Sequence, residues 1–275
     1  MNLAQKIFGS FRLGRINVNK EARRQKRLRS SLERKLLKNL QNLLRKHIRM
    51  DADDIDRDNY NPSESRRRKT NEGLILLRNH INQVYVTVFE DNQDRYQDLQ
   101  KQLEFNVFGR NIDIDDLAKA YIAERQLVLV GIFDGVSNQI DRIISKAFEE
   151  EGLTQQEIAN SIRNKAPQIS ATRAAMITRT ETHSAVGHAQ HAYHEVVKDT
   201  VGVNMQKRWV STADGRTRTA HVLANGQIVN FDEDFLVGGS RMRFVGDPRG
   251  GARNVINCRC TIVYVNIEDV ENMED

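Results

Sequence analysis

Proline is almost absent from this chain, and that scarcity is the strongest constraint on its fold. Only Pro62, Pro167 and Pro248 occur in 275 residues, so long stretches lack the residue that breaks helices most effectively. Apolar residues recur at helical spacing in the first half, whereas glycine-rich turns and short β-branched runs follow residue 207. We therefore predict an α+β fold, with long N-terminal helices followed by a small C-terminal domain of mixed helix and β-hairpin.

Residues 1–50 form a strongly basic segment, which we interpret as a helical arm. Six lysines and nine arginines outnumber Glu21 and Glu33 there, which gives +13 in a chain whose total is +5. Leucines at helical spacing from Leu28 to Leu44 predict an amphipathic helix. Such a helix binds polyanions without reading sequence, although a solvated helix face also explains the charges. The residues expected to bind DNA or a protein partner are Arg23, Arg24, Lys26, Arg27, Arg29, Arg34, Lys35 and Lys38.

Two further regions are predicted between the basic arm and the C-terminal domain. Residues 51–65 contain closely spaced aspartates, asparagines and a proline, and we interpret them as an acidic linker. Residues 66–150 form a predicted long helical region, in which apolar residues step by three and four, as from Leu129 to Ala147. The run Val84–Phe89 is β-branched and compatible with a strand, but its surroundings favour a helix.

The C-terminal domain is predicted to cover residues 151–267, before an acidic tail at 268–275. A capping box beginning at Thr154 predicts a short helix that ends before Pro167. A longer helix is expected to begin at Ser170. Short strands and glycine turns are expected to complete the domain.

Composition excludes several classes of protein. No apolar run approaches the roughly 18 to 20 residues that span a bilayer, and the N-terminus lacks the pattern of a signal peptide. We expect a soluble protein, made inside the cell, with no membrane partner. Two cysteines also exclude a scaffold of several disulfides.

Both cysteines lie in one stretch, INCRCT, near the end of the chain. In an extended segment, Cys258 and Cys260 present their thiols on one face, and two thiolates supply half of a tetrahedral zinc shell. The best candidate for a third ligand is His221, followed by Asp214 or His183. A strained disulfide, a catalytic thiol and a pair of buried structural cysteines remain alternatives.

Three more histidines, His188, His191 and His194, follow one another at intervals of three. On a helix, neighbouring members of this series approach one another, but the three fan out across the surface. Chelation there requires outside ligands, so a helix with partly exposed histidines is the better interpretation.

Seven short motifs follow in order through the C-terminal domain. They are Arg179-Thr180-Glu181-Thr182, Arg208-Trp209, Asp214-x-Arg216-x-Arg218-x-x-His221, Asn225-Gly226, Phe235-x-x-Gly238-Gly239, Gly246-Asp247-Pro248 and Asn257-Cys258-Arg259-Cys260. Over roughly Glu151 to Val265, their order and spacing closely resemble the head-morphogenesis domain of the phage Mu F-like minor head proteins. The chain departs from this pattern at Val245, where we would expect a proline.

The resemblance implies a minor head structural protein of a tailed phage, assembled in the host cytoplasm and located in the virion, in the head interior or at the portal vertex. It implies a role in head morphogenesis, and in DNA packaging or ejection. The expected partners are portal protein, other head proteins and packaged double-stranded DNA, with several copies at one vertex. The motifs do not cover residues 1–150, so the basic arm is assigned to DNA or portal binding on its charge alone.

Two interpretations of the motif residues stay open. In the first, the protein is not an enzyme: Trp209 anchors a small core, and Arg179 and Glu181 pair with charged residues of the turn at 214–218. In the second, a metal-dependent nuclease or hydrolase, His221 and the cysteines bind zinc, and Glu181 or the aspartate of the turn acts as base. The motif residues that either interpretation must place are Arg179, Glu181, Trp209, Asp214, Arg216, Arg218, His221, Asn257 and Arg259.

Overall fold

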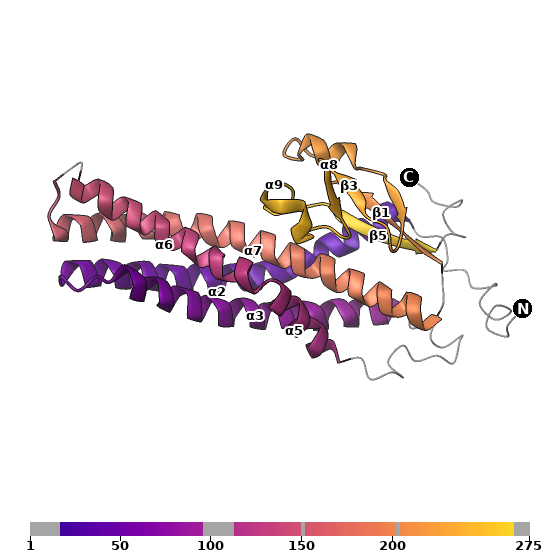
Figure 1. Cartoon of the computed structure of the whole chain (residues 1–275), viewed down its shortest axis with the longest axis horizontal. Coiled ribbons are helices and arrows are strands. Elements are labelled where there is room, and N and C mark those ends of the chain that lie inside the picture. The colour runs from indigo at the N-terminus through magenta and orange to yellow at the C-terminus, as the bar shows by residue number, and fades with distance from the viewer. Residues whose placement is uncertain (1–16, 96–112, 150–151, 202–203, 267–275) are drawn as a thin grey trace, which may run out of the picture. The chain divides into compact units, whose positions relative to one another are not determined.

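The computed structural model describes residues 17–95, 113–149, 152–201 and 204–266, and these form an α+β structure (Figure 1). The helices are α2 (Val18–Asp56), α3 (Pro62–Arg95), α5 (Ile114–Glu124), α6 (Gln126–Glu149), α7 (Gln155–Val201), α8 (Thr219–Leu223) and α9 (Gly251–Val255), with a 3-10 turn at Pro248–Gly250. The strands are β1 (Met205–Val210), β2 (Ile228–Asn230), β3 (Phe235–Val237), β4 (Ser240–Met242) and β5 (Thr261–Asn266). The predicted fold class is confirmed. The acidic tail and the first 16 residues of the basic arm lie outside the described residues.

The chain forms two compact units, and each draws on separate segments of the sequence. The first, here called the helical unit, contains residues 33–82 and 119–181. The second, here called the β-containing unit, contains residues 1–32, 83–118 and 182–275, and with them all the described strands. The helices α2, α3, α5 and α7 therefore each supply residues to both units. None of the helices within the described ranges is long and apolar enough to cross a bilayer.

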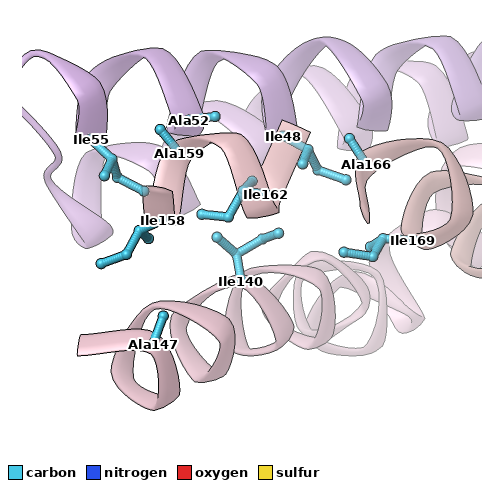
Figure 2. Close-up of a cluster of buried hydrophobic side chains, with 10 residues drawn as sticks. All are labelled: Ile48, Ala52, Ile55, Ile140, Ala147, Ile158, Ala159, Ile162, Ala166 and Ile169. Atoms are coloured by element: carbon cyan, nitrogen blue, oxygen red, sulfur yellow. The ribbon is translucent and has the colours of Figure 1, made fainter. Parts of the chain in front are cut away.

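The core of the helical unit is built from isoleucine and alanine stripes. Figure 2 shows side chains of α2, α6 and α7 directed toward one another in this core. The ten buried residues are Ile48, Ala52, Ile55, Ile140, Ala147, Ile158, Ala159, Ile162, Ala166 and Ile169. Most of them are separated by three, four or seven residues, which places them on one face of each helix, so burial of that face holds the three helices together.

The acidic linker predicted at 51–65 is mostly helical, so that prediction is wrong. Helix α2 continues to Asp56, and α3 begins at Pro62. Asp51 is buried and forms an ion pair with Lys69 of α3, which is also buried. The aspartates in this segment are therefore partners for cations on neighbouring helices, and the pairing favours helix over an open loop.

Helix α7 continues through Pro167, so the predicted break is also wrong. Proline removes one helical hydrogen bond and costs about 3 kcal/mol inside a helix. The apolar stripe nevertheless continues on both sides, where Ile162, Ala166 and Ile169 are all buried in the same core. The Ser170 hydroxyl donates to the Pro167 carbonyl at 3.0 Å, within the helix, rather than starting a new one.

Two local predictions are confirmed. The capping box is present, since the Thr154 N–H donates to Glu157 Oε2 at 2.8 Å and the Glu157 N–H donates to Thr154 Oγ1 at 3.4 Å. The β-branched run Val84–Phe89 lies inside α3 as a helix. Val84, Tyr85, Val88 and Phe89 are buried, which explains why apolar residues gather there.

The β-containing unit holds two small antiparallel sheets. The larger has the strand order β2-β1-β5, and in it Trp209 of β1 lies opposite Ile262 of β5. The smaller pairs β3 with β4. Trp209 is fully buried and meets the Phe235 ring edge-on at 5.4 Å between centroids, as expected for a core anchor. Val18, at the start of α2, packs against Val263 of β5.

A glycine on α7 allows the loop at residues 244–247 to approach the helix. A Cβ at Gly187 would lie 2.1 Å from the carbonyl oxygen of Val245, and one at Gly246 would lie 2.6 Å from Ser184 Cα. Gly246 also has φ of +80°, which side chains rarely adopt. The two glycines therefore fix where the C-terminal domain meets this part of α7, with Val245 in the position where the family resemblance led us to expect proline.

A pair of glycine substitutions tests the packing of the helical unit. A Cβ at Gly73 of α3 would lie 2.0 Å from the Phe133 ring, whereas nothing lies within 4 Å of a Cβ at Gly131 of α6. We expect Gly73→Ala to lower the free energy of unfolding by about 1–3 kcal/mol through overpacking. Gly131→Ala should raise it by up to about 1 kcal/mol, since alanine favours helix. Urea unfolding measures both, and equal stabilisation by the two changes would contradict the contact between α3 and Phe133.

Candidate metal centre

His221, Cys258 and Cys260 form a buried cluster in the β-containing unit. Nδ1 of His221 lies 3.3 Å from Sγ of Cys260 and 3.6 Å from Sγ of Cys258. The three possible ligand atoms lie within 4.8 Å of one another. Within the described ranges, this is the one group of three or more histidine, cysteine, aspartate or glutamate side chains arranged so that it could hold a metal ion. Each residue exposes at most 2% of its surface, and both cysteines are free thiols. The structure thus brings together the three residues predicted as zinc ligands.

Short local structures position these side chains. His221 lies on α8, and the cysteines lie between α9 and β5, in a turn rather than in a strand. Asn257 has φ of +57°, a left-handed conformation that asparagine tolerates better than most residues. The Cys258 N–H donates to the Val255 carbonyl at 3.1 Å, which closes the turn. The left-handed residue turns the chain so that both thiols face His221.

The pKa values of the two neighbouring thiols shift in opposite directions. A hydrogen bond from Cys260 holds the pKa of Cys258 well below its usual value, and His183 and His221 lower it further, against the effect of burial. The pKa of Cys260 is raised because it donates to Cys258 and because it is buried. The cluster therefore already favours one thiolate, the form of cysteine that binds metals and attacks electrophiles.

Arg29 was predicted to bind DNA or a protein partner, but it supports the cysteine segment instead. It is buried, and its Nη1 lies 2.8 Å from Nδ1 of His183 and 3.3 Å from the carbonyl oxygens of Arg259 and Cys260. A guanidinium only donates hydrogen bonds, so Nδ1 of His183 accepts and Nε2 carries the proton. That Nε2 is buried, and His183 also acts on the Cys258 thiol, whose pKa it lowers. A run of basic residues gives no signal that one of its members points inward.

Arg24, which was also predicted to bind DNA or a protein partner, forms ion pairs within the chain instead. It pairs with Glu21 at 3.1 Å and with Asp91 at 2.5 Å, so its charge is largely compensated. The residues of the predicted set that are exposed are Arg23, Lys26, Arg27, Arg34, Lys35 and Lys38.

Asp214 is not part of the metal cluster. Its Oδ1 accepts from Nη2 of Arg259 at 2.6 Å, and this bond holds the pKa of Asp214 well below its usual value. Arg216 approaches the same carboxylate at 3.5 Å and is largely exposed. Arg218 donates to the Ile256 carbonyl at 2.5 Å. Arg218 and the pair of Asp214 with Arg259 therefore hold the turn at 212–218 against the cysteine segment.

Glu181 pairs with Arg125 and not with the turn at 214–218, so that part of the polar-network prediction is wrong. Its Oε2 accepts from Nη2 of Arg125 at 2.7 Å, both side chains are buried, and both residues belong to the helical unit. Burial raises the pKa of Glu181, while Arg125 acts in the opposite direction. Arg125 lies in the short break between α5 and α6, and its partner is 56 residues away, which no sequence pattern indicates. Arg179, half-buried on α7, belongs to the same unit.

The histidine series on α7 packs among aromatic rings. His191 stacks on Phe231 at 4.6 Å between centroids, and His194 stacks on Tyr264 at 4.0 Å. Both histidines are buried, so the prediction of exposed rings is wrong for them, and burial lowers the pKa of His191 to about 2. His188 is half-buried and bonds to the Tyr85 hydroxyl at 2.5 Å. His191 and His194 therefore serve as core residues, and the low pKa of His191 keeps its ring neutral.

Residues 138–263, from α6 to β5, match the sequence profile of the family described as Phage Mu protein F like protein. This part of the chain is a phage Mu F-like domain, as the motifs predicted. The metal cluster and all seven motifs lie within it.

Two curated relatives were found. The chain is 37% identical over 122 residues to minor head protein GP7 of Bacillus phage SPP1, which covers 42% of this chain and 36% of that protein. It is 34% identical over 130 residues to NAD(+)--arginine ADP-ribosyltransferase EFV of Enterococcus faecalis, which covers 46% of this chain and 25% of that protein. The matches thus span about a quarter to a third of these relatives. No solved structure shows a significant match.

The buried pair of Glu181 and Arg125 gives a prediction for stability. Glu181→Gln leaves the Arg125 charge buried without its carboxylate, so we expect the free energy of unfolding to fall by about 3–5 kcal/mol. The double variant Glu181→Met/Arg125→Met removes both charges and should recover most of that loss. Urea unfolding of Glu181→Met, of Arg125→Met and of the double variant completes a double-mutant cycle. Simply additive losses would show that the two side chains do not interact.

Proposed function

We propose that this chain is a structural protein of a tailed-phage head that binds packaged DNA and portal protein through α2. The observation that carries the proposal is the presence of a Mu F-like domain and a cationic helix in one chain. The family is named for a phage protein, and the phage relative is named a minor head protein. We therefore attribute to this chain the role of the phage relative, in the virion, and not the activity in the name of the bacterial one.

The exposed cations of α2 support the DNA-binding part of the proposal. Arg23, Arg27, Arg34 and Lys38 recur at intervals of four and seven residues, so they share one side of the helix. The buried leucines of α2, such as Leu36, occupy other positions of the same repeat. A row of exposed cations of this kind contacts successive phosphates without reading base sequence.

A surface groove in the β-containing unit extends the cationic side of α2. It has a volume of about 320 Å³, and its lining includes Arg23 and Lys26 of α2 and Thr212 and Arg259 of the C-terminal domain. Arg259 is already paired with Asp214, so Arg23 and Lys26 supply the charge available to a phosphate. The groove is thus a candidate phosphate-binding site, lined by residues of α2 and of the Mu F-like domain.

Both carboxylates named as the base of a hydrolase are engaged by arginines. Glu181 is bound to Arg125, and Asp214 is bound to Arg259 with its pKa lowered. A carboxylate with a lowered pKa is a weak base. We therefore favour a structural role, at the portal vertex or in the head interior, with several copies serving morphogenesis and the packaging or ejection of DNA.

Neutralising part of the exposed surface of α2 should weaken DNA binding. In Arg23→Gln/Lys26→Gln/Arg27→Gln, three phosphate contacts are lost, so the slope of log K against log salt should fall in magnitude by about 2 to 3. Fluorescence anisotropy with two duplexes of unrelated sequence measures this slope, and both duplexes should bind equally.

The matched control removes the same charge elsewhere. Arg142, Lys146 and Lys165 are exposed cations of α6 and α7, and Arg142→Gln/Lys146→Gln/Lys165→Gln should leave the slope unchanged. Binding that does not depend on salt, or equal effects of the two triple variants, would exclude α2 as the DNA-binding surface.

Portal association is tested separately, by co-expression and co-purification with portal protein of the same phage. We expect the full chain to be retained, and Arg34→Gln/Lys35→Gln/Lys38→Gln to be retained less, because these exposed cations are assigned to an acidic protein surface. Absence of retention for both forms at low salt would refute the portal part of the proposal and leave the DNA part to its own test.

A further inference from the structure

We propose that His221, Cys258 and Cys260 are ligands of one buried Zn²⁺ ion that stabilises the fold. The inference concerns the stability of the Mu F-like domain and is independent of binding to DNA or portal protein. It stands on the spacing of the three ligand atoms, on their burial and on the groups around them.

The spacing of the ligand atoms matches a zinc tetrahedron. With Zn–S near 2.3 Å and Zn–N near 2.0–2.1 Å, a tetrahedral ion separates nitrogen from sulfur by about 3.5 Å. The separations from Nδ1 of His221 are 3.3 Å to Cys260 and 3.6 Å to Cys258. An ion therefore fits between the three atoms without movement of the backbone. Thiolate and imidazole ligands favour zinc over magnesium or calcium.

The position of the cluster in the chain explains how a metal ion would stabilise the domain. His221 lies 37 residues before Cys258, and the segment between them contains β2, β3 and β4, each of three residues. Strands this short form a small core, and small domains are commonly reinforced by a metal or a disulfide. A zinc ion joins α8 to the turn before β5 and closes this segment into a loop.

The surroundings are those of a supported metal site. Arg29 Nη1 lies 2.8 Å from Nδ1 of His183, so Nε2 of His183 carries the proton and can donate a hydrogen bond. Outer hydrogen-bond donors of this kind hold thiolate ligands in place.

The same burial disfavours a catalytic thiol. Cys258 exposes 1% of its surface and Cys260 2%, so neither thiol is accessible from the surface. A nucleophile must reach a substrate. A buried metal site therefore explains the contact between the two cysteines and His221 better than a catalytic thiol does.

Cobalt replacement in the full-length chain tests the site without any substitution. The protein is purified in a metal-free reductant, treated with a chelator and titrated with Co²⁺. We expect saturation at one ion per chain, with a thiolate-to-cobalt charge-transfer band and the intense visible bands of tetrahedral cobalt. Zn²⁺ should then displace the cobalt and raise the Tm by several degrees, because it binds the folded state. Binding without the thiolate band, or no binding, would overturn the proposal.

Variants locate the site within the chain. Cys260→Ser should lose the charge-transfer intensity of one thiolate and bind Co²⁺ at least tenfold more weakly, and His221→Gln should also weaken binding at least tenfold. The control His188→Gln alters a histidine of the series on α7 and should retain the complete spectrum. If Cys260→Ser fails to fold, the cobalt spectrum and the stoichiometry of the unaltered chain still show whether the site exists. A spectrum that survives in Cys260→Ser and disappears in His188→Gln would transfer the site to α7.

Discussion

The continuity of α7 through Pro167 is the constraint on which both units depend. Residues 155–181 of this helix belong to the helical unit, and residues 182–201 belong to the β-containing unit. The lost hydrogen bond at Pro167 is offset because Ile162 and Ile169 are buried on either side of it. One helix thus carries isoleucines for one core and stacked histidines for the other.

The architecture was largely predictable because the spacing of apolar residues and the capping residues indicate helices locally. Leucine and isoleucine spacing indicated the long helices, and the capping box at Thr154 indicated where α7 begins. The errors share one cause, which is that tertiary partners override local preference. Asp51 resembled a residue of an acidic loop until Lys69 of α3 was seen beside it. In the same way, burial of the helix face outweighed the signal of Pro167.

The cysteine cluster was predictable for a different reason, since ordered motifs placed His221 and the C-x-C segment in one family domain. What the sequence did not indicate was the support around the cluster. The pairing of Arg29 with His183 spans 154 residues, and the buried partner of Glu181 lies between two helices, outside any motif. Contacts between residues so far apart leave no periodicity, so they are found only once the chain is folded.

Arg29 separates two properties that the basic helix combines in sequence. Its neighbours Arg23 and Arg27 are exposed and face solvent, whereas Arg29 is buried against the carbonyls of the cysteine turn. The helix can therefore gain or lose surface charge during evolution at most positions without disturbing the C-terminal domain, but not at this one. Neutralising every cation of the helix together would confuse damage to the fold with loss of affinity for polyanions, because one of those cations is a structural part of the domain.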